Sequence, residues 1–342
     1  MREPTGPRAP RAVDVAAAAG VSTATVSRAF NAPEKVAPDV RERVLQAARD
    51  LGWFPNAAGA ALASRRTMLV GALIPTLDQH VFAAQVNALQ ARFAEAGVTV
   101  LIGCSNYDLD HAAEQVRVML ARGMEALAIV GEEQRPALFN MIDTRAVPYV
   151  VMYSHRPHSP HPCIGFDNEA AFSEIARHLL DLGHRRFGLI HQPSTENDRV
   201  LARLEGVRNA LAGEGLAIRP RHIVEGPSEI EFGRQALRQI FAQDEPPTAI
   251  ICGNDALAFG ALIEARAMGI DVPGRLSITG FDDVPMAHFT EPPLTTMAVD
   301  NAAIGRASAD YLLARLNGQA VVSPGPMATA LIRRGSTGRP PV

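Results

Sequence analysis

The spacing of hydrophobic positions changes near residue 67, and the two parts of the chain predict different folds. In residues 11–55 the apolar positions recur every three or four residues, which is the spacing of amphipathic helices. From residue 68 onward, short continuous apolar runs alternate with amphipathic segments. Such runs are typical of buried parallel strands covered by helices on both faces. The pattern therefore predicts a small all-α domain followed by a larger α/β body.

Three short helices are expected in residues 11–55. The first ends at Gly20, which tolerates left-handed backbone, and Ser22 caps a second helix that ends near Asn31. Two helices joined by a turn of three or four residues form a helix-turn-helix. A third helix is expected to begin at Pro38 and to end at Gly52. The predicted core positions are Val13, Val15, Ala16 and Ala19 in the first helix, and Val40, Val44, Leu45, Ala48 and Leu51 in the third.

The second helix has an exposed face suited to DNA. Its short side chains allow the backbone to approach a phosphate or a base edge, and the fork of Arg28 fits guanine O6 and N7. The alternative is a helix of small residues packed against a neighbour, with its hydroxyl groups used for capping. The residues expected to face DNA are Ser22, Thr23, Ala24, Thr25, Ser27, Arg28 and Asn31.

Charge separates the two parts of the chain as well. Residues 1–66 hold ten Lys and Arg against six Asp and Glu, whereas the remainder holds 23 Arg against 30 acids. A basic segment on an acidic protein is expected where only one part contacts phosphate. The Pro- and Arg-rich residues 1–10 are expected to form a disordered arm.

The runs VDVAAAAGVSTATVSRAFNAPEKV and VRERVLQAARDLGWFPN, followed by a segment ending in LAS, resemble the DNA-binding region of the LacI/GalR transcription regulators. The resemblance continues to about residue 335. It implies a helix-turn-helix domain in 11–55 whose Thr23, Ala24 and Arg28 read the major groove. It also implies that 56–66 form a hinge helix and linker that fold on operator DNA, where Asn56 contacts DNA and Leu62 of each subunit enters the minor groove.

The body, residues 67–342, is expected to contain two doubly wound lobes, as in periplasmic sugar-binding proteins, which the family resembles. The N-lobe is predicted from about 67–165 and 297–323, and the C-lobe from about 166–294 and 324–337. Ligands of open α/β sheets bind beyond the carboxyl ends of the strands, so the cleft between the lobes is the expected effector site. The expected strands are 68–74, 98–103, 126–130, 149–152, 187–191, 249–252, 276–279, 294–299 and 328–332.

Polar and aromatic residues near these strand ends are the candidate effector contacts. The resemblance implies Asp282 in SITGFDD and Arg203 in RLEG, and less firmly Asn254. Phe166 is interpreted either as a wall of the cleft or as part of the core. For Asp255 and Asp283 we favour helix capping or loop bonding. The complete set of expected effector contacts is Asp282, Arg203, Asn254, Phe166, Gln79, Phe82 and Tyr153.

Enzyme functions find no support in the motifs. No Gly-x-Gly-x-x-Gly, P-loop or Gly-x-Ser-x-Gly pattern follows an expected strand, so we predict no catalysis and no cofactor. His155, His158 and His161 lie in a Pro-rich loop, and their spacing suits no common metal site. The three cysteines are far apart, which favours neither a disulfide framework nor zinc.

The sequence therefore predicts a cytoplasmic, homodimeric repressor that binds double-stranded operator DNA and a small effector, a sugar, a sugar acid or a related metabolite. The alternative is a solute-binding receptor for sugar uptake, which the helix-turn-helix and the lack of a secretion signal disfavour. An activator and a corepressor-dependent repressor remain open, because either ligand type would use the same cleft. The tail after Arg334 carries no heptad leucines, so we expect dimers without a tetramerisation coil.

Overall fold

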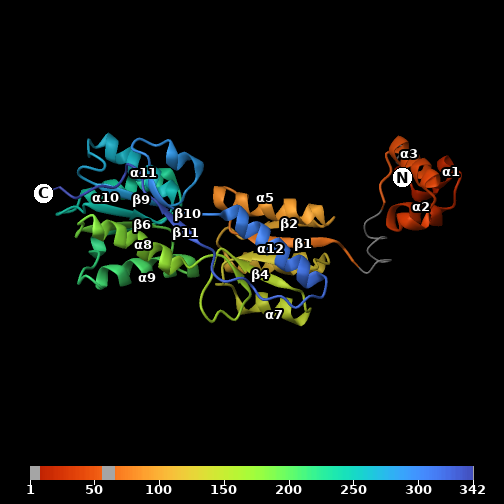
Figure 1. Cartoon of the computed structure of the whole chain (residues 1–342), viewed down its shortest axis with the longest axis horizontal. Helices are drawn as coiled ribbons and strands as arrows, with labels where there is room; N and C mark the ends of the chain where they lie inside the picture. Colours follow the sequence, from red (N-terminus) through yellow and green to blue (C-terminus); the bar gives the residue numbers. More distant parts are fainter. Residues whose placement is uncertain (1–7, 56–65, 342) are drawn as a thin grey trace, which may run out of the picture. The chain divides into compact units, whose positions relative to one another are not determined.

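The computed structural model describes residues 8–55 and 66–341, and the chain divides into two compact units, residues 1–68 and 69–342. The DNA-contact predictions for Asn56 and Leu62, and most of the expected arm and hinge, lie outside the described residues. Figure 1 shows the elements of both units. Among the described residues, no helix combines the length and apolar character needed to cross a bilayer.

The first unit is a small helical core. Gly20 and Gly52 follow its first and third α-helices with left-handed φ values of 66° and 62°, so both helices end where the sequence predicts. Val13 and Leu51 are 48% and 39% exposed, and their assignment to the core is wrong. Both lie in terminal turns, which the narrow core of three short helices does not enclose. The elements are α1 (Ala12–Ala19), α2 (Thr23–Asn31), the 3₁₀ turn η1 (Pro33–Lys35) and α3 (Pro38–Leu51).

The N-lobe of the second unit is built on a five-stranded parallel sheet in the order β2-β1-β3-β4-β5. Helices α5 and α12 pack together on one face, and α6 and α7 pack together on the other (Figure 1). The strands are β1 (Leu69–Ile74), β2 (Thr99–Cys104), β3 (Ala126–Val130), β4 (Tyr149–Met152) and β5 (Cys163–Ile164). The helices are α5 (His80–Glu95), α6 (Leu109–Ala121), α7 (Pro136–Thr144) and α12 (Asn301–Leu316).

The C-lobe is built on a six-stranded sheet in the order β11-β10-β9-β8-β6-β7, in which only β11 is antiparallel to its neighbour among the described strand pairs. The pair α8 and α9 and the pair α10 and α11 pack in this lobe. The strands are β6 (Phe187–His191), β7 (Ile223–Glu225), β8 (Ala249–Cys252), β9 (Ser277–Asp282), β10 (Thr295–Val299) and β11 (Thr329–Ile332). The helices are α8 (Asn168–Asp181), α9 (Asp198–Ala212), α10 (Ile230–Phe241) and α11 (Asp255–Ala267), with 3₁₀ turns η2 (Pro220–His222) and η3 (Pro285–His288).

The chain passes between the lobes three times. It leaves the N-lobe after β5, returns through Asp300 into α12, and enters the C-lobe again before β11. All of β10 pairs within the C-lobe, so the expected N-lobe segment 297–323 begins too early and the return lies after Val299. The N-lobe segment begins later than expected because β10 pairs with β9 of the C-lobe before the chain turns toward α12. The Met327 N–H donates to the Gly165 carbonyl at 2.8 Å, which joins the first and third connections. The predicted fold class is confirmed.

Candidate DNA-binding and effector sites

The second helix of the first unit, α2, presents a polar outer face. Ser22 is its N-cap, and the Ser22 hydroxyl accepts a hydrogen bond from the Thr25 N–H at 3.2 Å. Val26 and Ala29 point into the core, so the positions between them face outward. Of the described residues expected to contact DNA, only Thr25 is half-buried. The exposed ones are Ser22, Thr23, Ala24, Ser27, Arg28 and Asn31.

Arg28 is held along the helix and is not fully extended. Its Nε donates to the Ala24 carbonyl at 3.2 Å, which leaves the terminal guanidinium nitrogens for other partners. Asn31 donates in a similar way to the Ser27 hydroxyl at 3.3 Å. The alternative, a helix of small residues packed against a neighbour, finds no support in the exposure of these side chains. The face offers one strong cationic fork and several short hydrogen-bonding groups, which suits recognition of a DNA groove.

A second site lies in the cleft between the lobes of the body. An inner pocket of about 30 Å³ is nearly filled by its own side chains, and it shares Gln79, Tyr107, Gln192 and Asn197 with an outer cavity of about 560 Å³. The outer volume is within the range of small-molecule sites. Other surface cavities of the described chain, of about 350–460 Å³, are lined by no buried charged side chain. The residues that line the inner pocket are Gln79, Val81, Phe82, Tyr107, Tyr153, Gln192, Asn197, Arg199, Val200, Arg203, Asn254 and Asp282.

Arg203, on α9, is the most firmly positioned residue of the inner pocket. Its Nε donates to Asn168 Oδ1 at 2.8 Å, and its Nη1 donates to the Gly253 carbonyl at 3.1 Å. The guanidinium also lies over the ring of Phe281, 4.2 Å from the ring centroid. These contacts fix the plane of the group while it lines the pocket. A preorganised guanidinium of this kind binds hydroxyl or anionic groups at low entropic cost.

Asp282 faces Arg203 from the last position of β9. It has a φ of 108°, an unusual backbone conformation for an Asp, and it is buried. Burial raises the pKa of Asp282 to about 6, against the opposing effects of the Arg203 charge and the hydrogen bond from Tyr153. Most of the Asp282 population is therefore ionised at neutral pH. A carboxylate beside a guanidinium can accept from ligand hydroxyls while the guanidinium donates to them.

The other expected effector contacts divide into four that line the inner pocket and one, Phe166, that does not. Gln79, Phe82, Tyr153 and Asn254 all line the inner pocket, as the sequence predicts. Asn254 also caps α11, since its Oδ1 accepts from the Leu257 N–H at 3.1 Å.

Phe166 does not line either pocket. It is fully buried, and its ring packs edge-on against Tyr153 and beside Phe281. The structure therefore places it in the core, which is the second of the two interpretations given above. It supports the wall behind the cleft through Tyr153.

Asp255 and Asp283 have structural partners. The Asp255 side-chain oxygens accept from the Val284 N–H at 2.8 Å and from the Thr296 hydroxyl at 2.6 Å. Asp283 forms an ion pair with Arg334 at 2.7 Å. Loop bonding explains both residues, and neither lines the inner pocket.

Six residues of the inner pocket escaped the sequence prediction: Val81, Tyr107, Gln192, Asn197, Arg199 and Val200. Gln192 directly follows β6, and Asn197 caps α9 with Oδ1 toward the Val200 N–H. The strand-end argument that located Asp282 applies equally to this β6–α9 connection. Tyr107 follows β2 by the same rule and accepts a hydrogen bond from Gln79 Nε2 at 2.8 Å.

Contacts between the lobes hold the cleft closed. The Asp198 carboxylate of the C-lobe accepts from the backbone N–H groups of Glu132 and Glu133 in the N-lobe, at 3.2 and 3.4 Å. Arg135 of the N-lobe forms an ion pair with Glu196 at 2.7 Å. The lobes are thus joined at the same edge of the cleft that Tyr107 and Arg199 line.

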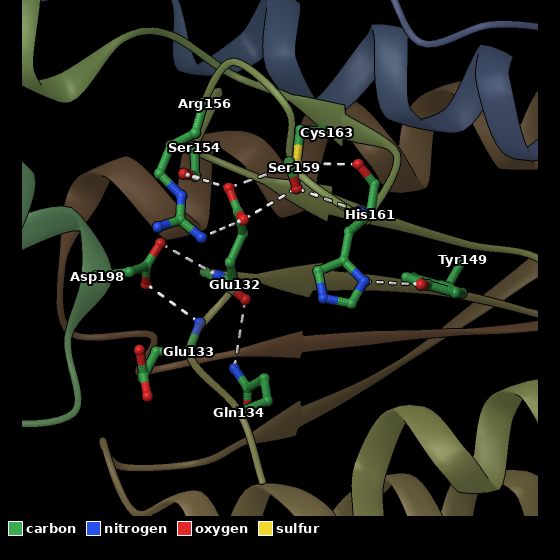
Figure 2. Close-up of polar contacts among 11 residues, drawn as sticks. Glu132, Glu133, Gln134, Tyr149, Ser154, Arg156, Ser159, His161, Cys163 and Asp198 are labelled. Carbon is green, nitrogen blue, oxygen red and sulfur yellow. Dashed lines mark hydrogen bonds and ion pairs between the residues drawn. The ribbon is translucent and has the colours of Figure 1, made fainter. Parts of the chain in front are cut away.

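The loop that meets Asp198 is itself fixed by a buried carboxylate, Glu132 (Figure 2). Glu132 accepts from Arg156 at 2.7 Å, from Ser159 at 2.9 Å and from Ser154 at 3.2 Å. Burial alone would raise the pKa of Glu132, but the hydrogen bonds from Arg156 and Ser159 outweigh it and hold the pKa below its ordinary value. The anion therefore ties the segment after β4 to the loop after β3.

The histidine loop contributes structure to the same region. His161 stacks on Phe139 with ring centroids 4.0 Å apart, and its Nδ1 lies 2.8 Å from the Tyr149 hydroxyl (Figure 2 shows the polar contact). Within 8–55 and 66–341, no group of three or more His, Cys, Asp or Glu residues is placed to hold a metal ion. The Pro-rich sequence around the three histidines predicts a solvated loop, but His161 packs against Phe139 and Tyr149.

A helix-turn-helix unit and a two-lobed body with a polar cleft define the class of ligand-responsive DNA-binding regulators. Two family models match the chain accordingly. The model for bacterial regulatory proteins of the lacI family matches residues 13–56, and the model for a periplasmic binding protein-like domain matches residues 176–337.

Curated relatives and solved structures agree with this class. The repressor CytR of Escherichia coli K12 is 33% identical over 326 residues, which cover 95% of each chain, and the regulator GntR of Pseudomonas aeruginosa is 34% identical over 90% of each. A LacI family regulator from Silicibacter pomeroyi has a TM-score of 0.89 at 27% identity, covering 96% of this chain and 100% of that one. The lac repressor dimer bound to operator and an anti-inducer has a TM-score of 0.85 at 27% identity, covering 97% and 100%. The chain belongs to the lacI family of bacterial regulatory proteins, and it is a DNA-binding transcriptional regulator with an effector-binding body.

Proposed function

We propose that this chain is a repressor that binds a near-palindromic operator as a homodimer and responds to a small polar metabolite in the cleft. The observation that carries the proposal is the presence of both sites in one chain. A row of exposed short side chains with Arg28 on α2 suits a DNA groove, and buried Arg203 and Asp282 face each other in a closed cleft. The curated relatives CytR and PurR are named as repressors, which supports this direction of control.

The DNA-binding part is proposed to comprise 11–55 with 56–66 as the connection to the body. In this scheme Thr23, Ala24 and Arg28 read base edges, while Asn56 contacts DNA and Leu62 acts as the minor-groove wedge. Two half-sites read by two subunits explain why such operators are near-palindromic. The protein would then act where its DNA lies, in the cytoplasm.

The regulatory step is proposed to be a change in lobe closure. Three connections between the lobes form a hinge, and the contacts of Asp198 and Arg135 stabilise the closed state. An effector that binds one closure state better shifts the population toward that state. A coupling free energy of about 1–3 kcal/mol would change operator affinity by about 5- to 150-fold.

The effector is proposed to be a sugar, a sugar acid or a related metabolite. Carboxylate, amide and guanidinium groups line the inner pocket beside aromatic walls, which is the lining that polyhydroxylated ligands require. The lac repressor has been solved bound to ONPG in a repressed state, and the regulator CelR in complex with cellobiose, at 28% and 26% identity. These ligands belong to those two proteins, and they support the proposal of a polar ligand in the cleft of this chain.

The homodimer is proposed to form through the body. Four large apolar side chains, namely Ile263, Met268, Met286 and Phe289, are 40–76% exposed on or just after α11 and on the segment after β9. Large contiguous patches of exposed apolar side chains mark interaction surfaces. The lac repressor in a structure similar to this chain is described as a dimer.

The proposal is tested by selecting DNA sites from a random pool with the full-length protein and measuring their affinity by fluorescence anisotropy. Wild type is expected to prefer selected sites over random DNA by about a thousandfold or more. Arg28→Ala should lose this preference, whereas Arg49→Ala, an exposed arginine on α3, should keep it. Equal binding of wild type to every sequence would refute the proposal.

A further inference from the structure

One buried cation in the cleft has no protein partner. Arg199 lies in the first turn of α9 and is 8% exposed, so its side chain is more than nine-tenths buried. Among the described residues it makes no hydrogen bond and no ion pair within 4.0 Å. A guanidinium that lines a cleft without an acceptor on the protein is free to donate charge-assisted hydrogen bonds to an anionic ligand.

The position of Arg199 directs it into the effector site. It lines the inner pocket together with Tyr107, Asn197 and Arg203. On its other side the guanidinium lies against Gly131, where a Cβ atom would collide with it, and Gly131 has a left-handed φ of 84°. The absence of a side chain at Gly131 therefore makes the room that Arg199 occupies.

The neighbouring acids are already engaged. Asp198, the adjacent residue, accepts two backbone N–H groups of the opposite lobe, and Glu132 is held by Arg156 and two serines (Figure 2). Glu196 pairs with Arg135 at the rim. None of these carboxylates forms an ion pair with Arg199 in the part of the chain that the structure describes.

The charges that face the inner pocket do not balance. Arg199 and Arg203 contribute two positive charges, and Asp282 is the one carboxylate among the described residues that line it. Gln192 adds a further polar group without a partner, since its buried Oε1 accepts no hydrogen bond within the described chain. The inner pocket therefore has a net positive charge and spare hydrogen-bonding capacity before any ligand enters, whereas the outer cavity is lined by Asp78, Glu196 and Glu229.

We propose that the effector is a small polyhydroxylated anion whose carboxylate or phosphate group binds Arg199. This inference rests on the proposed function and narrows its ligand class. Arginine binds either anion through charge-assisted hydrogen bonds. In this assignment the hydroxyl groups of the ligand bind Asp282, Arg203 and Asn254 in the inner pocket. The rest of the ligand extends into the outer cavity of about 560 Å³, where Thr76, Asn106 and Ser228 offer further polar groups.

The test compares acids with their uncharged parents on the full-length protein at constant ionic strength. The probes are gluconate and glucuronate as carboxylates, glucose 6-phosphate as the phosphate, glucose and glucitol as neutral parents, and inorganic phosphate alone. Thermal shift identifies binders and calorimetry gives their Kd. At least one anion should bind at least tenfold more tightly than its parent, and the two arms tell a carboxylate from a phosphate ligand.

Substitutions assign the preference to the residue. Arg199→Gln should weaken anion binding about tenfold or more and bring it to the level of the neutral parent. Arg199→Lys, which keeps the charge, should recover part of the preference. Arg208→Gln, an exposed arginine on the same helix, is the matched control and should bind as wild type does. Circular dichroism and the unliganded Tm establish that Arg199→Gln is folded.

The inference is overturned if no anion raises the Tm, if a neutral parent binds as tightly as its acid, or if folded Arg199→Gln keeps the preference. Operator binding separates this failure from failure of the proposed function. If a neutral sugar releases the selected operator, the regulator stands and the anion assignment is wrong. If no DNA is selected at all, the proposed function itself is wrong.

Discussion

Tyr153 and Asp282 come from different lobes, and the phenol hydroxyl of Tyr153 donates a hydrogen bond to Asp282 Oδ1. Tyr153 follows β4 of the N-lobe, and Asp282 ends β9 of the C-lobe. Burial raises the pKa of Tyr153 well above its ordinary value, and the Asp282 charge adds to this effect, so Tyr153 stays a donor at neutral pH. The bond thus links the two lobes inside the effector site.

Replacing Tyr153 with Phe should destabilise the body. The change removes the only hydrogen-bond donor recorded for the buried Asp282 carboxylate among the described residues, which costs about 1–3 kcal/mol. Urea unfolding followed by circular dichroism measures the loss. Tyr107→Phe is the control, because the Tyr107 side chain is 46% exposed and water can replace its bond to Gln79. Equal stability of wild type and Tyr153→Phe would show that the bond between the lobes contributes nothing.

Asp255 should make the stability of the body depend on pH. Burial, and then the charge of Asp282, raise the pKa of Asp255 to about 8. A carboxyl group whose folded pKa is raised contributes stability that is complete below its unfolded pKa of about 3.9 and is lost as pH rises through the folded value. Wild type should therefore lose stability relative to Asp255→Asn between about pH 4 and pH 8, by at most about 1.4 kcal/mol per pH unit.

Urea unfolding of both proteins at a series of pH values checks this difference. Above pH 8 the difference should become constant, because Asp255 is then ionised in both states. Ionisation of Asp282 also changes the free energy of unfolding with pH, but this change is largely the same in wild type and in Asp255→Asn, so most of it cancels in the difference. A difference that stays flat from pH 4 to pH 8, or that changes in the opposite direction, would contradict the assignment of a protonated Asp255.

The single tryptophan of the chain, Trp53, should report on the first unit alone. Its ring packs edge-on against Phe30 with centroids 5.4 Å apart. Phe30→Ala should lower the urea midpoint of tryptophan emission by the equivalent of about 2 kcal/mol, less than for a fully buried Phe, because Phe30 is half-buried. The matched change in the body, Phe139→Ala, should leave the emission midpoint unchanged. A shift of the emission midpoint by Phe139→Ala would show that the two units unfold together.

The fold was predictable because its signals are local. Helix ends at Gly20 and Gly52 follow from backbone conformations that glycine adopts easily, and the parallel strands follow from continuous apolar runs. The exposure of Leu51 was not predictable from periodicity, since the pattern does not say where a neighbouring helix ends. The course of β10 depended on pairing with β9, a long-range relationship that the pattern of a single segment does not contain.

The effector site was predictable in part for the same reason. Asp282 ends a strand and Asn254 and Tyr153 follow strand ends, where ligands of open α/β sheets bind, and the resemblance to the LacI/GalR regulators also implies Asp282 and Asn254. Arg199 was missed because it lies in the first turn of α9, eight residues after β6, and because only the absence of a protein partner marks it as a site residue. Only the structure shows that Asp198, Glu132 and Glu196 have other partners and that a buried guanidinium remains.

The coupling between the two sites is tested most directly by titrating a labelled, selected operator with the full-length protein, with and without a saturating effector identified by the ligand panel. For wild type the operator Kd should change by about 5- to 150-fold. Asp282→Asn should bind operator in the absence of effector and lose this change. The account is contradicted if calorimetry shows the effector bound to wild type while the operator Kd stays the same.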